Sequence, residues 1–334
     1  MPPRLRQWLL RLAALVLAAL LLSALVLFGY LPRAAQPSQV RVDQSAERVE
    51  RGRYLTINVL QCVDCHSVRD WQLYGGPPMP PIGAGRPCMD RDTPTAGVNV
   101  GQEFFPGVLC IRNITPDEPT GIGAWTDGEI IRAIREGVGR DGRGLFPIMP
   151  YFIYRHLADE DVEAVVAFLR TLPQARSTQP PKQVIDFPLN LLVRLWPQPV
   201  TEPVPLPDRH TDRLAYGAYL ARIARCEFCH SPRNPNSLEP FAGRRFSGGM
   251  PFFLGPDRIM YPMNLTPHVT GLGTWTKEQF IARFRIHTEP QPVMPEQNTL
   301  MNWNAFAGMS DEDLGLLWDF FQTLPPVELR REPL

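Results

Sequence analysis

The sequence predicts an all-α protein in which one N-terminal membrane-spanning helix precedes two similar helical units. Residues 12–31 form an uncharged, almost wholly apolar run. Residues 46–174 and 208–326 carry the same motifs in the same order, which indicates an internal repeat. Proline supplies 37 of the 334 residues, well above the usual share of about 5%. Because proline breaks helix interiors, we expect short helices joined by long Pro/Gly-rich loops.

The N-terminal run predicts a membrane anchor. About 20 apolar residues are needed to span a bilayer core of about 30 Å. Arg4, Arg6 and Arg11 precede the run, so residues 1–11 are expected in the cytoplasm. The alternative is a cleaved signal peptide, whose apolar region is only about 7–15 residues long and ends in a small-residue site. Residues 32–45 show no such site, so we expect a retained single-pass anchor in the inner membrane, with the remaining chain in the periplasm.

The composition indicates a globular protein and gives no sign of nucleic-acid binding. Apolar residues make up 44% and charged residues 20%, which excludes wholesale disorder. The 34 basic residues balance 34 acidic ones. A nucleic-acid partner would require a basic stripe, and none is expected.

Four of the six cysteines lie in two C-x-x-C-H pentapeptides, at residues 62–66 and 226–230. This is the attachment signal of c-type haem. Residues three apart on a helical turn share a face, so both thiols reach one porphyrin edge and the histidine reaches the iron. The sequence predicts two covalent haems, with thioethers at Cys62, Cys65, Cys226 and Cys229 and with His66 and His230 as iron ligands.

Other chemistry of paired cysteines fits less well. A zinc ribbon places its two C-x-x-C units about 15–20 residues apart, much closer together than residues 62–66 and 226–230. A thioredoxin-like pair requires a βαβ pattern, which this sequence lacks. A structural disulfide within each motif leaves the histidine unexplained. Cys88 and Cys110 lie in one loop region, and in an exported protein we expect them to form a disulfide. Free buried thiols and a thiol ligand to iron are the alternatives.

Each unit is predicted to contain at least three helices. The first leads into C-x-x-C-H, the middle one covers residues 126–137 or 276–287, and the last begins near Asp159 or Asp311 and stops before Pro173 or Pro325. Gly52 and Gly217 occupy equivalent places before the two motifs. We expect them to permit close approach of the last helix near its aromatic residues, although an ordinary core role is the simpler alternative.

The repeat also predicts the second iron ligands. Met149 precedes Asp159 by 10 residues, and Met301 precedes Asp311 by the same number. Paired Met and His ligands suit electron transfer by raising the potential. Met294, in a local Val-Met-Pro match, is the rival to Met301.

A ligating histidine usually donates its other ring nitrogen to a carbonyl. The carbonyl of Pro77 is the candidate partner for His66, and that of Pro240 is a weaker candidate for His230.

Residues 175–207 join the units and contain eight prolines, and their centre is apolar. A free linker would be polar, so this Pro-rich segment is expected to dock across both units. Residues 327–334 form a C-terminal tail.

The two units resemble class I cytochrome c domains. As a pair they resemble the dihaem cytochrome c family that includes cytochrome subunits of bacterial membrane-bound alcohol and gluconate dehydrogenases. The residues that carry the match are the C-x-x-C-H motifs, residues 113–116, 120–126 and 145–151, the FLRTLP end of the first unit and their counterparts in the second.

The resemblance implies an electron-transfer protein without a catalytic site. Its partners would be redox proteins: a dehydrogenase or quinol-oxidising complex as donor, and a terminal oxidase or another acceptor downstream. A dihaem peroxidase and a dihaem thiosulfate dehydrogenase are the alternatives. A peroxidase needs a haem iron that opens to peroxide, whereas Met149 and Met301 predict two closed His/Met sites.

Overall fold

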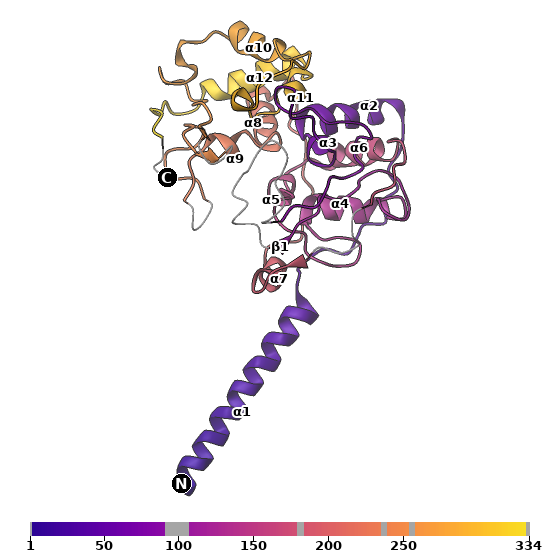
Figure 1. Cartoon of the computed structure of the whole chain (residues 1–334), viewed down its shortest axis with the longest axis vertical. Coiled ribbons are helices and arrows are strands. Elements are labelled where there is room, and N and C mark those ends of the chain that lie inside the picture. The colour runs from indigo at the N-terminus through magenta and orange to yellow at the C-terminus, as the bar shows by residue number, and fades with distance from the viewer. Residues whose placement is uncertain (1, 91–106, 179–183, 235–238, 254–257, 332–334) are drawn as a thin grey trace.

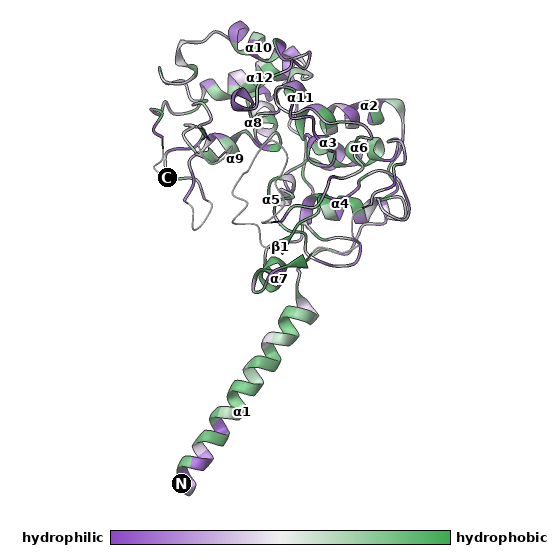
Figure 2. Cartoon of the chain, viewed as in Figure 1, coloured by the Kyte–Doolittle hydropathy of each residue, from purple (hydrophilic) through white to green (hydrophobic). Residues whose placement is uncertain are grey.

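A long N-terminal helix projects from a two-lobed helical body (Figure 1). The computed structural model describes the chain apart from residues 1, 91–106, 179–183, 235–238, 254–257 and 332–334. Helix α1 (Pro3–Leu25) continues through the π-helical turn η1 (Val26–Tyr30), and this helix is long and apolar enough to cross a membrane. Figure 2 shows its hydrophobic character along most of its length. A retained anchor and a cleaved leader share these properties, so retention stays a prediction.

The two lobes contain equivalent helices in the same order. The first lobe is built from α2 (Ala46–Tyr54) with the π-helical turn η2 (Leu55–Val59), α3 (Cys62–Cys65), α4 (Asp127–Glu136), α5 (Tyr151–Tyr154) and α6 (Asp159–Leu169). The second is built from α8 (Arg213–Ile223), α9 (Cys226–His230), α10 (Lys277–Arg285), α11 (Trp303–Ala307) and α12 (Asp311–Gln322), with 3₁₀ turns η5 (Leu272–Thr274) and η6 (Pro295–Gln297). The sequence repeat is therefore also a repeat of secondary structure.

Strand structure is sparse in the described residues. β1 (Gly107–Val108) pairs antiparallel with β2 (Val184–Ile185), and β3 (Phe252–Phe253) pairs antiparallel with β4 (Ile259–Met260). The prediction of a mainly helical protein is confirmed, but these two short antiparallel pairs were not foreseen. The first of them brings the long loop of the first lobe against the Pro-rich linker.

The middle helix of each lobe begins at a capping box. The Thr126 side chain accepts from the Glu129 backbone N–H, and the Glu129 side chain accepts from the Thr126 backbone N–H. Thr276 and Gln279 make the same pair of bonds at α10. Helix α4 then ends at Gly137, whose φ of 74° favours glycine. These local signals explain why the predicted and observed starts agree.

The two glycines before the C-x-x-C-H motifs lie where helices cross closely. A Cβ at Gly52 would stand 1.8 Å from the backbone oxygen of Ala164 in α6. A Cβ at Gly217 would stand 2.3 Å from the backbone oxygen of Leu316 in α12. The expected close approach of the first and last helices of each unit is confirmed, and only glycine permits it.

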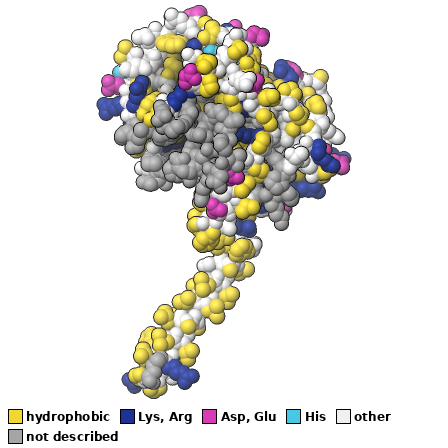
Figure 3. Space-filling view, in the orientation of Figure 1, with side chains coloured by type: hydrophobic (Ala, Val, Ile, Leu, Met, Phe, Trp, Pro, Cys, Tyr) yellow, Lys and Arg dark blue, Asp and Glu magenta, His cyan; other side chains and the backbone are white. Residues whose placement is uncertain are grey.

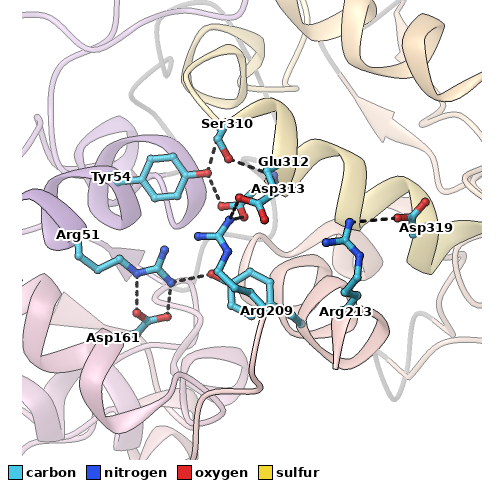
Figure 4. A network of polar contacts seen from close by, with 10 residues as sticks. Arg51, Tyr54, Asp161, Arg209, Arg213, Ser310, Glu312, Asp313 and Asp319 are labelled. Atoms are coloured by element: carbon cyan, nitrogen blue, oxygen red, sulfur yellow. Dashed lines mark hydrogen bonds and ion pairs between the residues drawn. The ribbon is translucent and has the colours of Figure 1, made fainter. Parts of the chain in front are cut away.

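The lobes meet through reciprocal tyrosine–aspartate contacts. The Tyr219 hydroxyl of the second lobe donates to Asp161 Oδ2 of the first over 2.7 Å. The Tyr54 hydroxyl of the first lobe donates to Asp313 Oδ2 of the second over 2.6 Å (Figure 4). Both aspartates are buried, and Arg51 also binds Asp161 with two hydrogen bonds. Because equivalent residues exchange partners, the lobes are related by a pseudo-two-fold arrangement and share one apolar core.

The Pro-rich linker runs along the first lobe. It contains α7 (Leu189–Leu192) and the 3₁₀ turn η4 (Val193–Leu195). The Asn113 side chain donates to the Ala175 carbonyl over 2.6 Å, and the Asp159 N–H donates to the Val204 carbonyl over 2.9 Å. These bonds at both ends tie the linker to the first lobe, and the expectation that it docks across both units stays a prediction.

Candidate functional site

The first C-x-x-C-H motif opens into a large cavity of the first lobe. Helix α3 begins after Gln61, whose φ of 57° turns the chain sharply from η2 into the motif. Cys62, Cys65, His66 and Met149 all line the same cavity, which has a volume of about 580 Å³. Cofactor sites usually measure about 300–1,000 Å³. The structure therefore brings together the four residues that the sequence assigned to the first haem.

His66 is oriented by a backbone carbonyl. Its Nδ1 lies 2.6 Å from the carbonyl oxygen of Arg112. A carbonyl only accepts, so Nδ1 carries the proton and Nε2 is left with its lone pair. Burial lowers the pKa of His66, which favours the neutral imidazole that binds metal. The prediction that Pro77 supplies this carbonyl is wrong: the Pro77 oxygen accepts from the Asp70 N–H instead.

The loop that carries this carbonyl is fixed by Asn113, a role that the sequence analysis missed. Its side-chain oxygen accepts from the N–H and hydroxyl of Thr115, and its amide donates to Thr120 and to the Ala175 carbonyl. Asn264 makes the equivalent set of bonds in the second lobe. The signal was present as the repeated Asn-x-Thr-Pro motif, but its purpose depends on the fold.

The second C-x-x-C-H motif repeats this geometry. Helix α9 follows Arg225, which has a φ of 63°. His230 is buried, and its Nδ1 lies 2.8 Å from the carbonyl oxygen of Met263, the residue before Asn264. Burial again lowers the pKa of the histidine. The weaker candidate Pro240 is therefore wrong, because Met263 occupies the place that Arg112 holds in the first lobe.

The backbone supports the register that pairs Met149 with Met301. The Tyr151 N–H donates to the Met149 carbonyl over 2.8 Å, and the Trp303 N–H donates to the Met301 carbonyl over the same distance. Each methionine thus ends its loop just before a short helix, α5 or α11. Met301 packs against the core, whereas the rival Met294 is 59% exposed.

The first thiol of each motif is not poised for thiolate chemistry. Burial raises the pKa of Cys62 and of Cys226 to about 12. Reactive or metal-binding thiols instead have lowered pKa values. Cys88 and Cys110 form the predicted disulfide, and Cys110 lies on the cavity wall.

A polar junction connects the two motifs across the lobes. The Arg225 guanidinium donates to the Gln61 side-chain oxygen over 2.9 Å, and the Asn302 amide donates to the same oxygen over 2.8 Å. Arg69 in turn donates to Asn302 over 2.7 Å. Gln61 and Arg225 directly precede the two motifs, and Asn302 directly follows Met301. The junction therefore connects residues that are next in sequence to candidate ligands of both haems.

Arginine side chains dominate the charge of the cavity. Those that line it are Arg69, Arg86, Arg112, Arg143 and Arg225. Within the part of the chain that the structure describes, the buried Nε of Arg225 has no hydrogen-bond partner. Guanidinium groups bind carboxylates in a planar, bidentate geometry. A cofactor that carries two carboxylates and takes covalent, imidazole and thioether bonds, as haem c does, fits the residues of this cavity.

The amino-acid sequence of the chain is similar to those of several known cytochromes. The chain is 29% identical over 305 residues to the alcohol dehydrogenase (quinone) cytochrome c subunit of Gluconacetobacter polyoxogenes, covering 85% of the chain and 58% of that protein. It is 30% identical over 257 residues to the fructose dehydrogenase cytochrome subunit of Gluconobacter japonicus, covering 73% and 46%. It is 31% identical over 151 residues to a dihaem cytochrome c-type protein of Cereibacter sphaeroides, covering 43% and 49%. No protein-family model matches the chain.

These relatives define a class of electron-transfer proteins. They are cytochromes c, which implies covalently bound haem c and supports electron transfer by a cytochrome. The chain is thus a homologue of the cytochrome c subunits of dehydrogenases and of a dihaem cytochrome c, and the resemblance seen in the sequence is confirmed. It spans about half the length of these three relatives.

Proposed function

We propose that the chain is a membrane-anchored periplasmic cytochrome c with two haems, one in each of two cytochrome c domains at residues 46–174 and 208–326. It would carry electrons from a dehydrogenase or quinol-oxidising complex to a downstream acceptor such as a terminal oxidase. Haem, when bound, supplies one-electron redox chemistry. The protein's task is to attach it, ligate it and tune its potential.

The observation that carries the proposal is the repeated histidine geometry. In both lobes a C-x-x-C-H histidine donates Nδ1–H to the carbonyl before an Asn-x-Thr-Pro motif, as His66 does to Arg112 and His230 to Met263. Such a bond holds the ring and raises the basicity of the nitrogen that faces the iron. Two histidines held in the same way support two haems of the same class.

The residues have distinct roles in the proposal. Cys62 and Cys65, and Cys226 and Cys229, form thioethers. His66 with Met149, and His230 with Met301, hold the two irons. Closed His/Met sites suit a carrier rather than an enzyme, since neither iron offers an open position to a substrate such as peroxide.

Cysteine variants test the number of haems. Replacing Cys226 and Cys229 with alanine should leave one of two covalent haems, measured by haem stain on a denaturing gel and by the pyridine haemochrome spectrum per chain. The control Val269→Ser changes a residue that is 69% exposed in the second lobe and should keep both haems. Recovery of two covalent haems from the Cys226/Cys229 variant would contradict the assignment of the second site.

A further inference from the structure

The linker carries an exposed apolar surface at the base of the body. It consists of residues 184–196, which include β2, α7 and η4, and we call it the basal segment. Phe187 is 78% exposed, and Leu192, Leu195 and Trp196 are each at least 40% exposed. Figure 2 shows this hydrophobic segment beside the end of α1, and Figure 3 shows hydrophobic side chains gathered there. A patch of this kind on a protein surface marks an interaction site.

The basal segment is tied directly to the end of the apolar run. Arg194 donates through Nε to the Leu27 carbonyl over 2.7 Å and through its terminal nitrogen to the Leu31 carbonyl. Its guanidinium also lies over the Phe28 ring, 5.5 Å from the ring centre. Leu31 is the last residue of the uncharged run. These hydrogen bonds therefore fix the position of the basal segment beside the C-terminal end of the N-terminal helix.

The segment is also held firmly to the first lobe. Val193 is buried, and its carbonyl oxygen would stand 3.0 Å from a Cβ at Gly144. The Trp196 ring packs edge-on against Phe146 with ring centres 6.3 Å apart. The exposed side chains therefore belong to a fixed surface of the body.

We infer that the basal segment is a second membrane contact, which inserts its exposed apolar side chains into the boundary between lipid headgroups and acyl chains. The inference rests on the proposed anchoring by α1. If the N-terminal helix spans the bilayer, Leu27 lies about one helical turn, on the order of 5 Å, below Leu31. Interfacial segments are buried by about 5–10 Å, so the Arg194 bond places the basal segment at that depth.

The composition of the segment fits a lipid partner. Trp196 suits the interface, where tryptophan is enriched, and the charged Arg194 guanidinium is hydrogen-bonded to the Leu27 and Leu31 carbonyls. A contact at α1 and a second at the basal segment would fix the orientation of the body on the membrane. The two candidate haem sites would then face their redox partners at a constant height.

Lipid photolabelling tests this inference on the full-length protein with its haems. The protein is reconstituted in phosphatidylethanolamine/phosphatidylglycerol vesicles that contain a phospholipid with a photoreactive group near the headgroup end of its acyl chain. Labelled peptides are then mapped by mass spectrometry. The aqueous reference is the peptide with Val269, which is 69% exposed in the second lobe on the loop before α10.

We expect peptides from α1 and from the basal segment to be labelled several-fold more than the Val269 peptide. The double variant Phe187→Ser/Leu195→Ser should lower labelling of the basal segment and leave that of α1 unchanged. If α1 is labelled but the basal segment only matches the Val269 peptide, the inference is overturned, and a protein partner becomes the candidate occupant. If neither α1 nor the basal segment is labelled, the anchor fails as well.

Discussion

Removing one hydroxyl from the contact between the lobes should measurably destabilise the protein. The Tyr219 hydroxyl donates to Asp161 Oδ2 over 2.7 Å and accepts from the Ala158 N–H over 3.2 Å. Burial and the neighbouring Asp161 raise the pKa of Tyr219 above its ordinary value, so the hydroxyl keeps its proton. Tyr219→Phe removes both bonds but leaves the Arg51–Asp161 ion pair in place.

The expected loss in the free energy of unfolding follows from the hydrogen bond that Tyr219→Phe removes and the N–H that it leaves without a partner. A hydrogen bond to a charged group contributes about 1.5–3 kcal/mol, and a buried N–H without a partner costs about 1–3 kcal/mol. Because Asp161 retains two bonds from Arg51, we expect the free energy of unfolding to fall by about 2–4 kcal/mol. With an m value of about 2–3 kcal/mol per molar urea, the midpoint should fall by about 1–2 M.

Urea unfolding of the detergent-solubilised protein, followed by circular dichroism, measures this midpoint. Tyr54→Phe should have a smaller effect in the same direction, because Tyr54 binds the buried Asp313 but the Ser310 N–H that it accepts from is exposed. Tyr30→Phe is the control, since this 64%-exposed residue ends the N-terminal helix, and it should change stability by less than about 0.5 kcal/mol. The reasoning is refuted if Tyr219→Phe shifts the midpoint no more than Tyr30→Phe does.

Three further predictions test the fold and the candidate sites. Gly52→Ala would place a Cβ against the Ala164 carbonyl and should cost about 1–3 kcal/mol or more, seen as a lower melting temperature. Met149→Ala should open one haem to carbon monoxide in the reduced protein and lower its potential, whereas Met294→Ala should do neither; an unchanged potential in Met149→Ala would exclude that ligand. Arg225→Gln removes a positive charge from the cavity wall and should lower a haem potential in a redox titration by an amount on the order of 50 mV, since a nearby positive charge disfavours the ferric state; a raised potential would contradict this.

Features with local causes were predictable from the sequence. The capping boxes at Thr126 and Thr276 depend on residues three apart, and the close approach at Gly52 followed from the absence of a side chain at repeated positions. Met149 and Met301 were paired by counting from a repeated acidic motif. In each case the information lay within a few residues or in the register of the repeat.

Features that depend on tertiary placement were not predictable. Pro77 was the candidate partner of His66, but the fold brings the Arg112 carbonyl there instead. Tyr54 and Tyr219 occupy equivalent positions in the sequence repeat. The repeat does not show, however, that each tyrosine binds an aspartate of the other unit. The same holds for the bond between Arg225 and Gln61, which depends on how the lobes dock.

The haem content and ligation of the purified full-length chain test the central claim most directly. A pyridine haemochrome assay combined with intact-protein mass spectrometry counts covalent haems, and the oxidised spectrum reports spin state and methionine ligation. The account predicts two c-type haems per chain, both low-spin, both with the far-red sulfur-to-iron band and both unreactive to carbon monoxide when reduced. A single covalent haem, or one high-spin haem that turns over peroxide, would contradict it.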